Sequence, residues 1–406
     1  MFKNSIRMNR KVFKGPAPRI VGISMNAGYL GPRLNHAQLE GLIKRAYEEK
    51  LALFIWGAPG IGKSMTVEKV ARELAKIMGR EYLKWNEISR KKRLEVAENP
   101  TKYFVLVDIR LSQYDPSDLK GIPRLDGLHT DWRPPLWLYA LSLEGAAGII
   151  FLDELNLAPP SVQSAAYQLV LDKCLGDYRL SPMVGVIAAG NPPDYRPHSH
   201  DPAPPLLNRF LNVELAIPDV ESWAQWALEN GVDPRIVSFL KMRPELLFKW
   251  TPELRSAAFP TPRTWSFAST MLKKATGADG IGISVAAAVG VGVANEFLAF
   301  LKLTQRFDVQ AILASPETTP LPKSPDEVYA LLAALQSHYV KHRSPELLER
   351  MFILAQRIST ELSAEYAIFL LKSLKAIDQD LFVRVGETSS AFGDLSKKIV
   401  PMAYGS

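Results

Sequence analysis

The chain has 406 residues, 47% of them hydrophobic and 22% charged, which allows one to three globular domains and excludes a largely disordered, collagen-like or coiled-coil protein. Its single cysteine, Cys174, excludes an internal disulfide framework and a cysteine-built zinc site, and is typical of a reducing, cytoplasmic compartment. The net charge of +7 comes from one end: residues 1–39 hold seven basic and no acidic residues, so the other 42 basic residues equal the 42 acidic ones. This distribution removes the main reason to expect a basic nucleic-acid-binding face on the body of the protein.

Residues 1–35 are rich in glycine, proline and basic residues, so we expect a basic N-terminal arm. Its composition fits a solvated arm or docking segment, a segment that binds an anionic polymer, or an arginine-rich transit peptide. The uncharged, largely apolar run at residues 280–295 has 16 residues, fewer than the roughly 20 that cross a bilayer. We therefore expect no membrane span.

Hydrophobic patterning predicts strands that alternate with helices. Apolar residues recur at helical spacing over residues 37–50, and a continuous apolar run over 51–56 indicates a strand buried on both faces. The later strands are expected at 103–111, 148–154, 184–190 and 210–217, with helices at 63–79 and 160–172 and a hairpin tip at Gly176 and Asp177. This alternation predicts an α/β fold with a parallel sheet and right-handed crossovers.

A complete phosphate-binding loop follows the first predicted strand and precedes a helix, the context that the P-loop motif needs. Its glycines let backbone N–H groups turn towards phosphates, and the N-terminus of the helix favours negative charge. Lys63 is expected to reach the β- and γ-phosphates of ATP, and Ser64 to bind Mg²⁺. The expected nucleotide-binding residues are Gly57, Ala58, Pro59, Gly60, Ile61, Gly62, Lys63, Ser64 and Met65.

Two acidic residues end the predicted strand at 148–154 (GIIFLDE). Behind a P-loop, Asp153 is expected to hold Mg²⁺ through its water shell, and Glu154 to polarise the attacking water. Asn191 ends the next strand, where its amide is placed to orient that water if this strand neighbours the P-loop strand. The alternatives are a strand followed by a helix-capping acid, and a turn-forming asparagine before Pro192.

Two arginines complete an ordered set of motifs. Arg209 lies just before the last predicted strand, in LLNRF, and Arg263 lies at the start of a later helix, in TPRT. Either arginine alone is typical of a solvated surface. They stand out because they follow a P-loop, an acidic pair and a strand-end asparagine in that order.

This order resembles that of the AAA+ ATPases, and more narrowly that of the MoxR branch, which is related to the dynein-type (AAA_5) modules. The segments that carry the resemblance are GIIFLDELN at 148–156, APPSVQSA at 158–165, AGNP at 189–192 and LNRF at 207–210, within a similar region of about 36–300. Insertions at about 118–147 and 174–184 match as well, and in this family both project towards a central pore. The long second segment, 85–101, and the polar stretch at 108–123 depart from the family pattern.

The resemblance implies a sheet order of 5-1-4-3-2 and four parts: a basic arm (1–35), an α/β nucleotide-binding core (36–217), an α-helical lid (218–305) and a C-terminal helical extension (306–406). It also implies that Lys63, Glu154, Asn191, Arg209 and Arg263 are catalytic, with ATP and Mg²⁺ (at Ser64 and Asp153) as cofactors. The expected assembly is a homo-oligomeric ring of six subunits. The implied function is remodelling, assembly or maturation of a protein client, with a von Willebrand factor A domain protein as partner.

Two other functions remain open. A nucleic-acid-translocating motor of the same superfamily would need basic residues on the hairpin at 174–182, which offers only Arg179, offset by Asp177. A nucleotide-gated scaffold with little turnover would not need Glu154 and Arg209. Stimulation of ATPase activity by DNA or by a protein partner would discriminate between these functions.

Overall fold

The computed structural model describes residues 31–127, 129–195, 202–250, 258–275 and 277–403. The greater part of the predicted arm, residues 1–30, lies outside these ranges. The described chain forms two compact units. The first comprises the residues up to Ala58 and from Lys63 to Ala216, and the second comprises Pro59–Gly62 and the residues from Ile217 onwards.

The first unit is built on a seven-stranded parallel sheet with the order β1-β11-β2-β10-β7-β4-β3. Its strands are β1 (Arg33–Leu34), β11 (Leu211–Leu215), β2 (Leu53–Trp56), β10 (Met183–Gly190), β7 (Ala147–Asp153), β4 (Tyr103–Arg110) and β3 (Glu81–Lys84). The five strands predicted from the sequence are β2, β4, β7, β10 and β11. They lie in the predicted order, 5-1-4-3-2, which confirms the α/β fold class.

Two edge strands, β1 and β3, were not predicted. β1 lies inside the stretch assigned to the arm, and its pairing with β11 is supported by an ion pair between Arg33 and Glu214 at 3.7 Å. Gly31, just before β1, has φ +94°, and a Cβ there would lie 2.1 Å from the carbonyl oxygen of Asn212. β3 is partly exposed along its whole length and therefore lacks the apolar run that marks the central strands.

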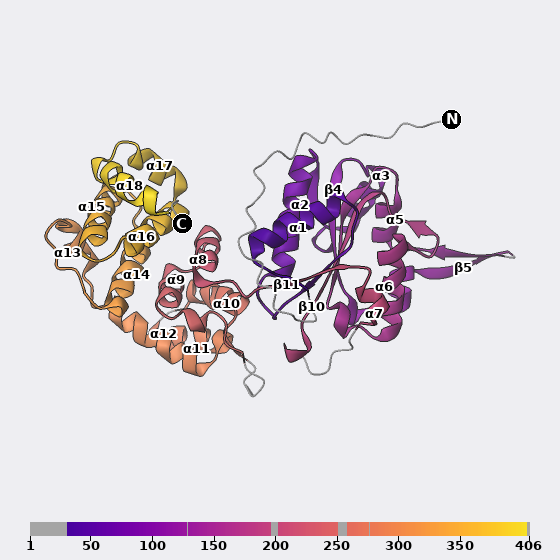
Figure 1. The fold of residues 1–406 in the computed structure, drawn as a ribbon, viewed down its shortest axis with the longest axis horizontal. Helices are drawn as coiled ribbons and strands as arrows, with labels where there is room; N and C mark the ends of the chain where they lie inside the picture. The colour runs from indigo at the N-terminus through magenta and orange to yellow at the C-terminus, as the bar shows by residue number, and fades with distance from the viewer. Residues whose placement is uncertain (1–30, 128, 196–201, 251–257, 276, 404–406) are drawn as a thin grey trace. The chain divides into compact units, whose positions relative to one another are not determined.

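Helices cover both faces of this sheet (Figure 1). On one face lie α1 (His36–Glu48) and α2 (Lys63–Ile77), and on the other lie α3 (Arg90–Glu98), α5 (Leu136–Ser142) and α6 (Pro160–Asp172). α1 begins at Asn35, whose side chain accepts from the backbone N–H of Gln38 while the Gln38 side chain accepts from that of Asn35. Such a capping box satisfies two N–H groups that a helix start leaves without partners.

Both predicted insertions contain a hairpin. The first contains β5 (Ile122–Asp126) paired with β6 (His129–Arg133), and the second contains β8 (Cys174–Leu175) paired with β9 (Tyr178–Arg179). Gly176, at the predicted tip of the second hairpin, has φ +55°. The β5–β6 hairpin extends away from the sheet in Figure 1, and Leu125 on it is 83% exposed.

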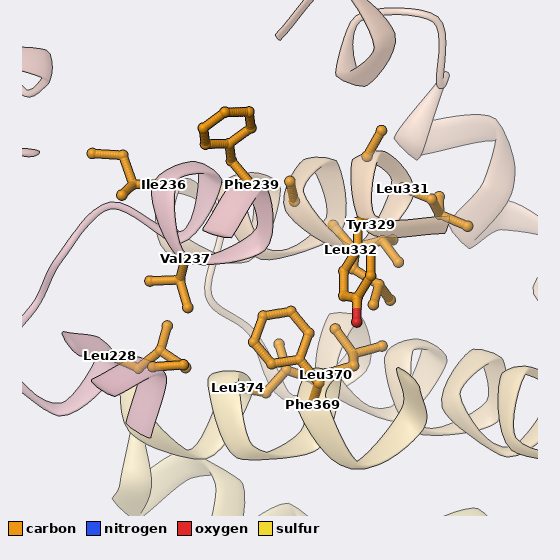
Figure 2. Packing of buried hydrophobic residues seen from close by; sticks show 14 of the residues in the cluster. Leu228, Ile236, Val237, Phe239, Tyr329, Leu331, Leu332, Phe369, Leu370 and Leu374 are labelled. Atoms are coloured by element: carbon orange, nitrogen blue, oxygen red, sulfur yellow. The ribbon is translucent and has the colours of Figure 1, made fainter. Parts of the chain in front are cut away.

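The second unit is helical, as predicted, and its described part shares one hydrophobic core from Val220 to Leu395. Figure 2 shows part of this core, where Leu228 and Val237 of the early helices lie beside Phe369 and Leu374 of a later one. Because that core runs through both the predicted lid and the predicted C-terminal extension, the boundary between them at 305 stays a prediction. Its helices are α8 (Val220–Glu229), α9 (Pro234–Met242), α10 (Pro262–Leu272), α11 (Gly277–Val289), α12 (Val291–Thr304), α13 (Val309–Ala314), α14 (Pro325–Lys341), α15 (Pro345–Glu361), α16 (Ala364–Ile377), α17 (Gln379–Gly386) and α18 (Ser390–Ala403).

Within the described ranges, each helix is too short or too polar to cross a membrane.

One buried cation makes stability depend on pH. The Lys173 ammonium, just after α6, is buried without a hydrogen-bond partner in the described structure, and burial lowers its pKa from 10.5 to about 8. The unfolded chain therefore binds more protons than the folded chain between pH 8 and 10.5, so this group makes the protein more stable as pH rises through that window.

We expect Lys173→Met to stabilise the protein at pH 7, by at most about 3 kcal/mol, since one pKa unit corresponds to about 1.4 kcal/mol. Methionine fills similar space without a charge, and both residues bear the same cost of the left-handed backbone at φ +51°. Urea unfolding at pH 7 and pH 10 measures the effect. Equal pH dependence in the wild type and the variant would show that this ammonium is not the cause.

Candidate nucleotide-binding site

The carboxyl ends of neighbouring parallel strands bring together the predicted P-loop lysine, the acidic pair and the strand-end asparagine, but neither of the two predicted arginines. Trp56 at the end of β2 is in register with Gly190 at the end of β10, and the backbone N–H of Gly57 donates to the Gly190 carbonyl at 3.2 Å. On the other side of β10 lies β7, and Asp153 at its end is in register with Arg110 of β4. This edge is where open parallel sheets bind ligands.

Lys63 lies at the start of α2 with its ammonium turned back over the loop. It is 9% exposed, and its Nζ donates to the carbonyl oxygens of Gly57 at 2.7 Å and Ala58 at 3.0 Å, and to Oδ1 of Asn191 at 2.8 Å. All three acceptors are oxygen atoms at the sheet edge. The buried ammonium therefore occupies a position where phosphate oxygens can take the place of these acceptors.

Ser64 and Asp153 form the predicted metal pair. The Ser64 hydroxyl donates to Oδ2 of Asp153 at 3.4 Å, and burial raises the pKa of the Asp153 carboxyl against the opposing charge of Lys63. A buried carboxylate and a hydroxyl suit Mg²⁺, which binds through few protein oxygens and completes its shell with waters and phosphates. Among the described residues, no group of three or more His, Cys, Asp or Glu side chains could hold a metal ion. Binding of Mg²⁺ at Ser64 and Asp153 would therefore depend on waters and phosphates as further ligands.

Glu154 follows directly and adopts a left-handed backbone with φ +58°, which is uncommon outside glycine. Its backbone N–H donates to Oδ1 of Asp153 at 2.9 Å, and its Oε2 accepts from the Ser112 hydroxyl at 2.5 Å. The turn therefore separates the directions of two adjacent carboxylates. Asp153 lies against Ser64, while Glu154 lies against the segment that follows β4.

Arg209 lies at the amino ends of the strands, whereas the P-loop follows the carboxyl end of β2. Arg209 precedes β11, whose first residue, Leu211, is in register with Leu53 at the start of β2. Leu53 and Gly57 are four residues apart, which corresponds to roughly 13 Å along a strand. The exposed Arg209 side chain donates to the Pro205 carbonyl at 2.6 Å and lies over the Tyr167 ring at 4.6 Å.

Arg263 belongs to the second unit, in the first turn of α10, and its side chain is exposed. The loop residues 59–62 fall in the same unit, and the backbone N–H of Arg263 donates to the Gly60 carbonyl at 3.1 Å. Gly60 and Gly62 have φ of +74° and +105°, as the predicted loop turn requires. Met65 is 52% exposed, so its expected contact with nucleotide stays a prediction.

Three further polar residues at this edge were missed by sequence reasoning. They are Ser112 beside Glu154, the fully buried Asn156 beside Asn191, and Asp108 on β4, whose Oδ1 is buried without a hydrogen-bond partner in the described structure. Burial, and then the neighbouring Asp153 carboxylate, raise the pKa of Asp108. The available signal was their placement within, or just after, predicted central strands.

Comparisons with known proteins give no family assignment. No protein-family model matches the chain, and no curated protein matches it. Among solved structures it is similar to a mutant of Thermotoga maritima RuvB (14% identity, TM-score 0.31, covering 74% of this chain and 80% of that one). It is also similar to C. elegans PCH-2 (12%, 0.27, 85% and 68%) and to NtrX from Brucella abortus in complex with ADP (15%, 0.29, 86% and 68%). At these TM-scores the likeness carries no functional weight, and the function must be argued from the site.

Proposed function

We propose that the protein is a Mg²⁺-dependent ATPase of the AAA+ type. The observation that carries this proposal is the buried Lys63 ammonium held against Gly57, Ala58 and Asn191, beside the Ser64 and Asp153 pair. A cation, a carboxylate–hydroxyl pair and a strand-end amide at one sheet edge match the needs of phosphoryl transfer to water, which are positioning and charge neutralisation.

Each of these residues has a separate role in ATP hydrolysis. Lys63 exchanges its carbonyl partners for phosphate oxygens, and Ser64 and Asp153 hold Mg²⁺, which when bound neutralises charge on those oxygens. Glu154 accepts a hydrogen bond from the attacking water and draws off its proton, and Asn191 orients that water with the amide that Lys63 releases. The water oxygen bonds to the γ-phosphorus as the bond to the leaving β-phosphate oxygen breaks, which yields ADP and phosphate.

We further propose that the protein works as a ring, with six subunits as the expected number, and remodels a protein client as a MoxR-type chaperone with a von Willebrand factor A domain partner. The position of Arg209 away from its own P-loop supports a ring, because it leaves the guanidinium available to a neighbour. The β8–β9 hairpin does not favour a nucleic-acid motor, since Arg179 is its one basic residue and Asp177 offsets that charge.

Nucleotide binding and phosphate release test the core of this proposal. Lys63→Ala should weaken Mg·ATP binding about 10- to 100-fold, as expected for lost charge-assisted hydrogen bonds of about 1.5–3 kcal/mol. Lys69→Ala is the matched control, because Lys69 lies on the same helix, is 56% exposed and pairs with Glu40. A wild-type protein that neither binds ATP in calorimetry nor releases phosphate would refute the ATPase proposal.

The chaperone role and the nucleic-acid motor can be distinguished by testing whether a protein client or DNA stimulates ATP turnover. Duplex and single-stranded DNA are each added to the wild-type ATPase, as are proteins captured on the Lys63→Ala variant. Stimulation by DNA alone would favour the motor and contradict the chaperone role.

A further inference from the structure

Asn156 is a fully buried amide directly behind the candidate site. It lies in a short 3₁₀ turn, Leu155–Leu157, and its Nδ2 donates to the backbone carbonyl of Asn191 at 2.7 Å. A Cβ on Gly190 would lie 2.6 Å from Oδ1 of Asn156, so the amide packs closely against the backbone at the end of β10. Asn156 thus fixes the place where that strand ends.

The orientation of this amide follows from chemistry. A backbone carbonyl only accepts hydrogen bonds, so the nitrogen of Asn156 must face Asn191. Oδ1 is then buried with no hydrogen-bond partner in the described part of the chain, and a buried acceptor without a partner is destabilising. An apolar side chain in this position would avoid that cost. The bond to Asn191 is therefore the feature that distinguishes asparagine from a residue that only fills space.

Asn191 connects this bond to the ligand side of the site. Its Oδ1 accepts from Lys63 at 2.8 Å, so one chain of contacts runs from Asn156 through Asn191 to the P-loop lysine. Pro192 restricts the backbone of Asn191 to extended conformations, and Asn156 holds its carbonyl. The Asn191 side chain can then exchange Lys63 for a ligand while its backbone stays in place.

We infer that Asn156 is a positioning residue that holds Asn191 where its amide can distinguish ATP from ADP. The inference rests on the proposed ATPase function and deepens it. Asn156 lies behind Asn191 and does not itself contact nucleotide, so its loss should affect the response to the γ-phosphate more than the binding of the rest of the nucleotide.

The test is a double-mutant cycle on nucleotide discrimination. The Kd values for ADP and for a non-hydrolysable ATP analogue are measured by calorimetry for the wild type, Asn156→Ala, Asn191→Ala and the double variant. We expect Asn156→Ala to change the Kd for ADP less than twofold. The same variant should lower the preference for the ATP analogue over ADP about 5- to 10-fold, which corresponds to about 1–1.4 kcal/mol. The double variant should discriminate no worse than Asn191→Ala, because Asn156 acts through Asn191.

Two further variants separate positioning from general damage. Asn156→Asp keeps the size of the side chain but replaces the donor nitrogen, so it should lose discrimination as Asn156→Ala does. Gln163→Met is the control, since Gln163 is a buried amide that donates to the Ala158 carbonyl at 3.0 Å, and the variant should keep full discrimination at a similar loss of thermal stability. Additive effects in the cycle, or equal losses for ADP and the ATP analogue, would overturn the inference. A wild type that binds neither nucleotide would instead refute the proposed function.

Discussion

Glu154→Gln should retain ATP binding and lose turnover by about 10²-fold or more, a typical size for the loss of an aligned catalytic base. The glutamine has nearly the same shape, so Lys63, Ser64 and Asp153 keep their contacts. It cannot take the proton of the attacking water. Binding is measured by calorimetry with Mg·ATP, and turnover by phosphate release at saturating ATP.

The control is Glu98→Gln, since Glu98 is exposed at the end of α3. It should turn over at the wild-type rate. If Glu154→Gln hydrolyses ATP as fast as the wild type, the water-activating role belongs to another group. An acidic alternative is Asp108 on the neighbouring strand β4, whose pKa is raised by burial and by the Asp153 carboxylate.

The sequence predicted the central sheet well because its strands are buried on both faces. The residues of β2 are all buried, as are nearly all of those of β7 and β10, so each strand reads as an apolar run. The P-loop and the acidic pair follow two of these strands directly. Parallel strands place their carboxyl ends at one edge, so the meeting of Lys63 with Asn191 follows from the strand order.

The missed features depend on contacts between segments far apart in the chain. Ser112 and Glu154 are 42 positions apart, and Asn156 and Asn191 are 35 apart. A serine after a strand and an asparagine in a turn are ordinary in sequence, and only the register of β4, β7 and β10 gives them partners. β1 was missed for a related reason, since a two-residue strand has no periodicity and exists through its pairing with β11.

Arg209 is expected to act on a neighbouring subunit, and its removal should lower turnover about 10³- to 10⁵-fold, the effect of an arginine finger in GTPase systems. Arg209 precedes the first residue of β11, and β11 runs parallel to β2. It therefore lies at the amino ends of these strands, while its own P-loop follows the carboxyl end of β2. Specific activity should therefore fall on dilution, as subunits separate. Arg209→Lys should also be poorly active, since lysine lacks the planar fork of donors.

Mixing Arg209→Ala with Lys63→Ala decides between the two geometries. In a mixed ring, some interfaces join an intact P-loop to an intact finger, so activity partly returns although each variant alone is inactive. Arg45→Ala, an exposed arginine of α1, is the control and should be fully active alone. If mixed rings form and no activity returns, either Arg209 serves its own subunit or turnover needs every interface intact. Dilution separates these outcomes, because a finger that acts within one subunit gives constant specific activity down to concentrations at which only monomers remain, and that result would refute action across the interface.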